Sequence, residues 1–95
     1  MKQVAEKTFV ANLVSETSYS STPLGQHQST MTLYFIDDDS YFIEWDIPSL
    51  ETVETIGIYC EDGTKCICDY DGVFEMPEEA KQLLQENDFD LSLII

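Results

Sequence analysis

The chain of 95 residues carries 19 acidic residues against four lysines and contains no arginine, which gives a formal net charge of −15. A field of this sign repels nucleic acid and anionic membranes and attracts basic proteins, although crowded like charges also cost stability. Because this length suffices for one core, we expect a single acidic domain over residues 1–95. The 43% of hydrophobic and 12% of aromatic residues exclude a disordered acidic tail.

The basic side chains are unevenly spread along the chain. Between residues 8 and 64 the only one is His27, while the same stretch holds ten acidic residues. A small domain needs a net charge of only about 2–8 in magnitude for solubility. The negative charge beyond this range favours a functional role for the electrostatic field. The sign of the field indicates a basic partner but does not identify it.

The first half of the chain reads as strands. Residues 7–14 (KTFVANLV) form a first apolar segment, and the Ser/Thr-rich residues 15–29 predict a long connection or the tip of an extended hairpin. Two further apolar segments, 30–36 and 40–47, flank three consecutive aspartates and predict a second hairpin.

The register of this second hairpin follows from its apolar residues, because a slip of one residue would move every side chain to the other face. A three-residue loop at Asp37–Asp39 places the apolar side chains on one face as the pairs Phe35–Tyr41, Leu33–Ile43 and Met31–Trp45. The opposite face then carries the pairs Tyr34–Phe42, Thr32–Glu44 and Thr30–Asp46.

The second half begins at Pro48, which cannot donate to a strand ladder and ends the preceding strand. Residues 49–54 predict a short connection with one helical turn capped by Ser49. Residues 55–60 and 65–70 predict a third hairpin around Asp62-Gly63.

One helix is expected over residues 77–86, with Pro77 at its first position, Ala80, Leu83 and Leu84 as its apolar stripe, and Asn87 as a left-handed stop. Residues 89–95 alternate apolar side chains and predict a final buried strand. The predicted fold is α+β, an antiparallel sheet of about five or six strands with this helix packed on one face.

Cys60, Cys66 and Cys68, together with His27, could in principle supply four zinc ligands. The spacing of Cys66 and Cys68 is unsuitable, because two residues that are two apart on a strand do not converge on one metal ion. A Cys60–Cys66 disulfide requires a three-residue loop, and the odd number of thiols argues against it. We therefore expect reduced, metal-free cysteines that fill the core.

Catalytic motifs are not evident. The chain has one histidine and no arginine, and it lacks the G-x-S-x-G, P-loop and G-x-G-x-x-G patterns. Asp69 and Asp71 flank a turn, and calcium-loop spacing fails from Asp37 and from Asp69. We expect no enzymatic activity, no metal and no cofactor.

In composition alone the chain is similar to small acidic proteins that imitate nucleic acid, such as phage inhibitors of restriction, CRISPR or repair enzymes. This similarity suggests a non-enzymatic inhibitor, of the phage anti-CRISPR or anti-restriction type, that binds a basic, nucleic-acid-binding protein and not nucleic acid itself. The expected contact residues are those of the polar hairpin face and tip: Asp37, Asp38, Asp39, Glu44, Asp46, Tyr34 and Phe42.

Two alternatives use the same charge: an immunity or antitoxin protein that neutralises a basic toxin, and an acidic structural or adaptor domain. The N-terminal residues lack a signal-peptide pattern, and no apolar run is long enough to span a membrane. The expected address is the cytoplasm, or a host cytoplasm if the chain is a phage product.

Overall fold

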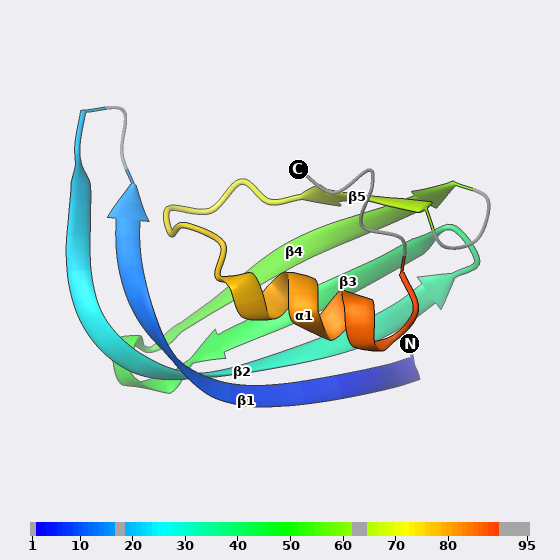
Figure 1. Ribbon diagram of the computed structural model, residues 1–95, viewed down its shortest axis with the longest axis horizontal. Coiled ribbons are helices and arrows are strands. Elements are labelled where there is room, and N and C mark those ends of the chain that lie inside the picture. The colour runs from blue at the N-terminus through cyan, green and yellow to red at the C-terminus, as the bar shows by residue number, and fades with distance from the viewer. Residues whose placement is uncertain (1, 17–18, 62–64, 90–95) are drawn as a thin grey trace.

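The computed structural model describes residues 2–16, 19–61 and 65–89, and its main element is one antiparallel sheet of five strands (Figure 1). The strands follow one another in the sheet in sequence order. In chain order the elements are β1 (Lys2–Glu16), β2 (Ser21–Asp37), β3 (Ser40–Ile47), the 3₁₀ turn η1 (Pro48–Leu50), β4 (Thr52–Glu61), β5 (Lys65–Asp69) and α1 (Glu78–Glu86). The prediction was an antiparallel sheet of about five or six strands with one α-helix, and the five strands and the helix agree with it. From residue 90 onward, the final strand expected over 89–95 lies outside the described residues.

The β1–β2 hairpin is much longer than the sequence predicts. Most of the Ser/Thr-rich segment is strand. Of the two predictions for this segment, the extended hairpin is therefore correct and the long connection is wrong. Pro23 is tolerated because β3 pairs with β2 only from Thr30 onward, which leaves this end of β2 with β1 as its one paired strand. A register shift lies beside it, and Gly25 at φ 83° supplies the left-handed backbone conformation there.

The β2–β3 register agrees with the prediction, since Phe35 pairs with Tyr41 and the succeeding pairs match. The loop differs from the prediction. Asp37 pairs with Ser40 around a two-residue turn, and a bulge at the half-exposed Ile36 restores the register. The extra residue therefore lies within β2 instead of in the loop. The apolar side chains of the hairpin still share one face and the polar ones the other.

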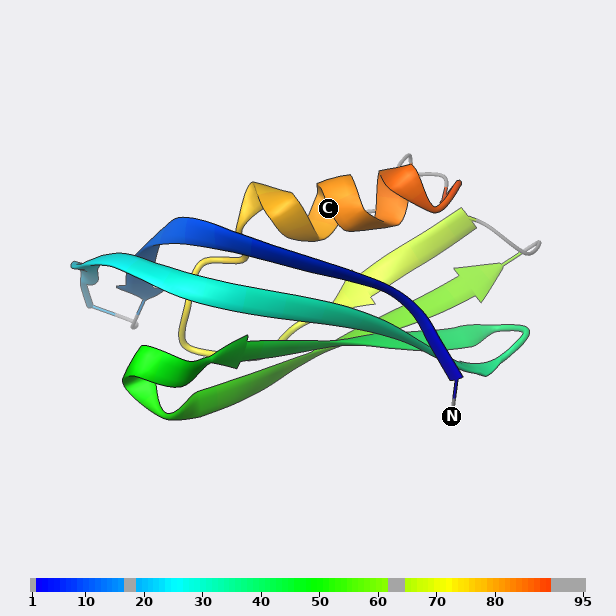
Figure 2. The same cartoon turned by 90° about the horizontal axis from the view of Figure 1, so that it is seen from below.

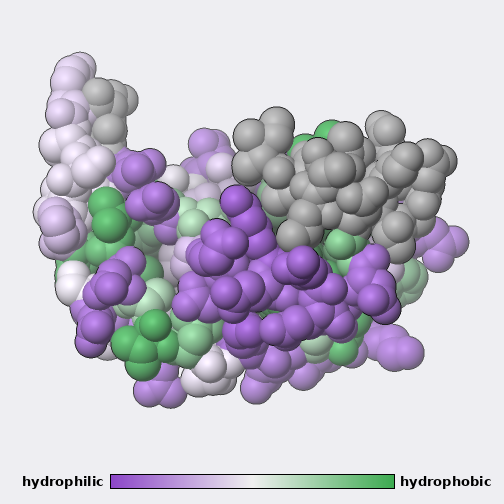
Figure 3. Space-filling model, viewed as in Figure 1, coloured by the Kyte–Doolittle hydropathy of each residue, from purple (hydrophilic) through white to green (hydrophobic). Residues whose placement is uncertain are grey.

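The core lies between the sheet and α1. Trp45, Met31 and Ile43 are fully buried, as predicted, and the helix contributes its buried residues Ala80, Leu83 and Leu84 to the same cluster. Figure 2 shows α1 running along one side of the sheet. The surface of the helix that faces the viewer in Figure 3 is hydrophilic.

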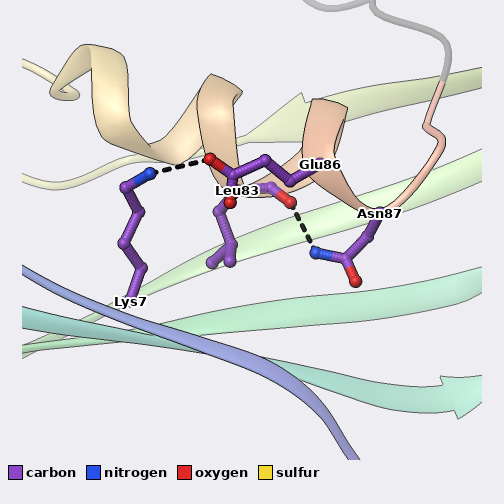
Figure 4. Close-up of polar contacts among 4 residues, drawn as sticks. All are labelled: Lys7, Leu83, Glu86 and Asn87. Carbon is purple, nitrogen blue, oxygen red and sulfur yellow. Dashed lines mark hydrogen bonds and ion pairs between the residues drawn. The ribbon is translucent and has the colours of Figure 1, made fainter.

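Polar contacts fix α1 to the sheet and close its end (Figure 4). Lys7 of β1 forms an ion pair of 2.9 Å with Glu86. The Asn87 side-chain amide donates to the Leu83 carbonyl at 2.7 Å. Asn87 itself has φ −109°, and the left-handed residue is Asp88 at φ 66°, so the predicted stop is displaced by one residue.

Two predicted helix starts also differ. Pro77 precedes α1 as its N-cap residue in an extended conformation instead of occupying the first turn. Ile47, not Ser49, is the N-cap of η1, and the Ser49 hydroxyl instead contacts His27 Nδ1 at 2.6 Å. None of the described helices is long and apolar enough to span a membrane.

Cys60 and Cys66 are joined by a disulfide, which contradicts the prediction that all three thiols are reduced. The backbone explains the bond. Glu61 pairs with Lys65, so the loop contains three residues and places the two cysteines directly opposite each other. The Cys60 N–H donates to the Asp39 carbonyl of the β2–β3 turn, so the cysteines form a non-hydrogen-bonded pair, in which side chains approach most closely. Cys68 is a free, half-buried thiol.

Candidate protein-interaction surface

The sheet has a second face, directed away from the core, which we call the outer face. Its residues alternate with the core residues along every strand, as the pleat of a sheet requires. The pairing places them in four rows across the strands. These rows are Thr8–Thr30–Asp46–Val53, Glu6–Thr32–Glu44–Thr55, Gln3–Tyr34–Phe42–Gly57–Asp69, and Ser40–Tyr59–Ile67.

Carboxylates are distributed over three neighbouring rows of the outer face. Glu44 and Asp46 are two residues apart on β3, which separates their Cα atoms by about 7 Å. Glu6 lies in the row of Glu44 but two strands away, or about 10 Å. Asp69 ends the next row on β5. Because these spacings are within about one Debye length at 0.1 M salt, the charges act together on an approaching partner.

Aromatic side chains lie among these carboxylates. The rings of Tyr34 and Phe42 stack with their centroids 4.9 Å apart and their planes at 22°. Phe42 neighbours Gly57, and a Cβ at that glycine would lie 3.2 Å from Cε2 of Tyr59. The Tyr59 ring therefore extends over the space that the missing side chain leaves.

Apolar surface on the outer face is also exposed to solvent. Val53 of β4 is 56% exposed, Tyr59 is 55% exposed and Ile67 of β5 is 45% exposed. Tyr59 and Ile67 are adjacent in the fourth row, whereas Val53 lies in the first row at the other end of β4. Adjacent exposed apolar groups rimmed by polar residues are typical of interaction sites. The outer face thus combines negative charge with groups that gain free energy when a partner desolvates them.

The three aspartates form the β2–β3 tip at one end of the outer face. Asp37 ends β2, and its carboxylate Oδ1 accepts a hydrogen bond of 2.9 Å from the Asp39 backbone N–H. This is the local contact by which aspartate stabilises turns. All three residues are exposed, so their charges remain available at the surface.

The described lysine side chains are directed elsewhere. Lys7 pairs with Met31 on the core side of β1 and binds Glu86 of the helix. Lys2 is opposite Phe35, also in the core-side register, and Lys81 belongs to α1. By register, the position of Lys65 on β5, opposite Glu61 and two residues before Ile67, falls on the outer face beyond the fourth row, whereas none of the four rows contains a basic residue.

The structure brings together most of the residues that the sequence singles out. Tyr34, Phe42, Glu44 and Asp46 share the outer face, and the aspartates of the tip border it. Sequence reasoning missed the contributions of the other strands: Glu6, Val53, Tyr59, Ile67 and Asp69. The alternation of residues 55–60 could have indicated Tyr59, but the position of Glu6 opposite Thr32 depends on the register shift between Leu13 and Val14, which no sequence pattern marks.

Two titratable groups lie on the core side, away from the outer face. Burial raises the pKa of the Cys68 thiol, against the attraction of Lys81, which is opposite to the shift that activates a cysteine. Burial raises the pKa of Tyr70 to about 12. His27 is hydrogen-bonded to Ser49 and to the Leu24 carbonyl, and within the described residues no group of side chains is arranged to hold a metal ion.

No protein-family model, curated protein sequence or solved structure matches this chain.

Proposed function

We propose that the protein is a non-enzymatic inhibitor that occupies the nucleic-acid groove of a basic protein by imitating nucleic acid. The observation that carries this proposal is the outer face, on which carboxylates in three rows lie beside the half-buried Tyr34 and Phe42 and the exposed Tyr59, and whose four rows contain no basic residue. The protein would act by binding alone, without a catalytic residue or a cofactor.

The charge of the outer face is complementary to that of a nucleic-acid-binding groove. Duplex DNA presents one negative charge about every 1.7 Å of its axis, and proteins that bind it supply a complementary array of basic side chains. A sheet with carboxylates about 7–10 Å apart offers such a groove a fixed array of anions. The long-range field of the −15 chain would accelerate encounter with the groove.

The packing supports the use of this particular face. Ala80, Leu83 and Leu84 of α1 are buried with the core residues of the strands, so the helix packs on the core side of the sheet. The outer face lies on the opposite side and is open to a partner. Because its residues belong to paired strands, their backbone has less conformational entropy left to lose on binding.

The alternatives from the sequence remain distinguishable. An immunity or antitoxin protein would use the same charge against a toxin, and an adaptor domain would use it only for solubility. Mimicry requires mutual exclusion with nucleic acid, whereas the other two functions do not. Competition therefore separates mimicry from both.

The proposal predicts that the outer face and the β2–β3 tip carry the affinity for a basic partner. Partners are captured from nuclease-treated lysate on the immobilised protein and then purified. The double variant Glu44→Gln/Asp46→Asn should lower the association rate for such a partner by about three- to tenfold, because steering charges act mainly on association. The triple change of Asp37, Asp38 and Asp39 to Asn should act in the same direction.

The matched control is Glu75→Gln/Glu78→Gln, which removes the same charge from two exposed residues at and before the start of α1. This control should change the association rate much less, measured by stopped-flow or surface plasmon resonance. Equal losses for both double variants would show that net charge, and not the outer face, determines binding, and would contradict the proposed interface.

A further inference from the structure

The third row of the outer face joins aromatic rings to a carboxylate. Tyr34 and Phe42 stack at 4.9 Å, and the next position is Gly57, over which the Tyr59 ring extends. Asp69 ends the row on β5. Glu44 lies two residues from Phe42 on the same face of β3, so carboxylates adjoin the rings from two directions.

This combination suits one kind of basic side chain. The guanidinium group of arginine is planar and weakly hydrated, stacks on aromatic faces and binds a carboxylate with two parallel hydrogen bonds. The ammonium group of lysine is a compact, strongly hydrated point charge that gains less from such a surface. Carboxylates alone would attract arginine and lysine alike, whereas the aromatic rings favour the guanidinium group of arginine.

We propose that the aromatic row of Tyr34, Phe42 and Tyr59, with Glu44 and Asp69 beside it, binds arginine side chains of the partner in preference to lysine. This inference rests on the proposed function and names the partner more narrowly, as a basic protein whose exposed binding segment is rich in arginine. The charge complementarity selects a basic segment, and the rings select guanidinium within it.

The test uses two synthetic peptides of equal length and charge, one with arginine at every basic position and one with lysine. Binding to the whole protein is measured by isothermal titration calorimetry at low salt. The arginine peptide should bind with a dissociation constant at least about fivefold lower, since an arginine stacked on a ring gains the most from cation–π attraction. The variants Phe42→Leu and Tyr59→Leu should bring the ratio of the two constants toward one, because each should weaken binding of the arginine peptide more than binding of the lysine peptide.

Tyr59 is 55% exposed, so Tyr59→Leu keeps the test valid if Phe42→Leu lowers the stability of the sheet. Tyr19→Leu is the matched control, because Tyr19 is 98% exposed and lies just before β2, away from the aromatic row. This variant should retain the preference of the unmodified protein.

Equal affinity of the unmodified protein for the two peptides would overturn the arginine preference. The proposed function would then rest on charge complementarity alone. Loss of the preference in Tyr19→Leu to the same extent as in Tyr59→Leu would also overturn it. If neither peptide bound, both the preference and the charge-based attraction behind the proposed function would be wrong.

Discussion

Tyr70 shows how one residue organises the end of the core. Its ring packs against Trp45, with centroids 6.2 Å apart, and its hydroxyl accepts a hydrogen bond of 3.3 Å from the Phe74 backbone. A Cβ at Gly72 would overlap the Tyr70 ring, so glycine is required at that turn. Burial is the main reason that its pKa rises to about 12; the Phe74 hydrogen bond opposes the shift and Glu54 adds to it.

This raised pKa predicts a loss of stability at alkaline pH. The unfolded value is near 10.0, so between pH 10 and about 12 the folded state retains a proton that the unfolded state has released. Stability that is fully present below pH 10 is therefore lost as the pH rises through this range. Tyr70→Phe has no such proton, and its free energy of unfolding should fall less between the two pH values.

Urea unfolding of the protein and of Tyr70→Phe at both pH values measures the difference. Tyr59→Phe is the control, since Tyr59 is an exposed ring on the outer face. Parallel pH dependence for Tyr70→Phe and the unmodified protein would contradict the assigned role of Tyr70.

At the scale of elements, the β4–β5 hairpin is cross-linked between its strands. The disulfide closes a loop of sequence separation 6 and lies on the core side, where Cys66 is fully buried. Closing a loop of this length restricts the unfolded chain and contributes about 2 kcal/mol to the free energy of unfolding. Reduction should therefore lower the stability by an amount of this order.

Urea unfolding with and without a reductant provides the measurement. Cys68→Ser retains the disulfide and should respond to the reductant as the unmodified protein does. Cys60→Ser/Cys66→Ser has no disulfide and should not respond. A response that persists in this double variant, or disappears in Cys68→Ser, would mean that the cross-link joins different residues.

Some elements could be predicted from sequence because a single pattern determines them. The apolar alternation of residues 30–47 determines the β2–β3 register and hence the positions of Tyr34, Phe42, Glu44 and Asp46. The length of the β1–β2 hairpin could not be predicted, since Ser/Thr-rich composition with Pro23 and Gly25 signals a loop and only pairing with β1 overrides it. The disulfide was not predicted because it depends on the length of the β4–β5 hairpin loop. The places of Glu6 and Asp69 on the outer face were not predicted because they depend on the register between strands.

At the scale of the whole molecule, the net charge is −15, and among the side chains that the structure describes it is opposed by the ion pair Lys7–Glu86. Screening should therefore stabilise the protein. Raising NaCl from about 0.05 M to about 0.5 M shortens the Debye length severalfold and should increase the free energy of unfolding on the order of 1 kcal/mol.

Chemical denaturation at the two salt concentrations measures this gain. Glu44→Gln/Asp46→Asn removes two neighbouring charges and should gain less from salt. An unchanged stability of the unmodified protein would show that repulsion among its carboxylates is minor.

Mimicry of nucleic acid by the outer face is tested most directly by competition for one binding groove. A captured basic partner is mixed with a labelled DNA duplex, and the unlabelled acidic protein is titrated while fluorescence anisotropy reports the bound duplex. We predict complete displacement of the duplex, weakened by the Glu44→Gln/Asp46→Asn variant and by salt, and no anisotropy change when the acidic protein meets the duplex alone. A ternary complex in which the partner holds duplex and acidic protein together, with neither weakening the other, would contradict the proposed function.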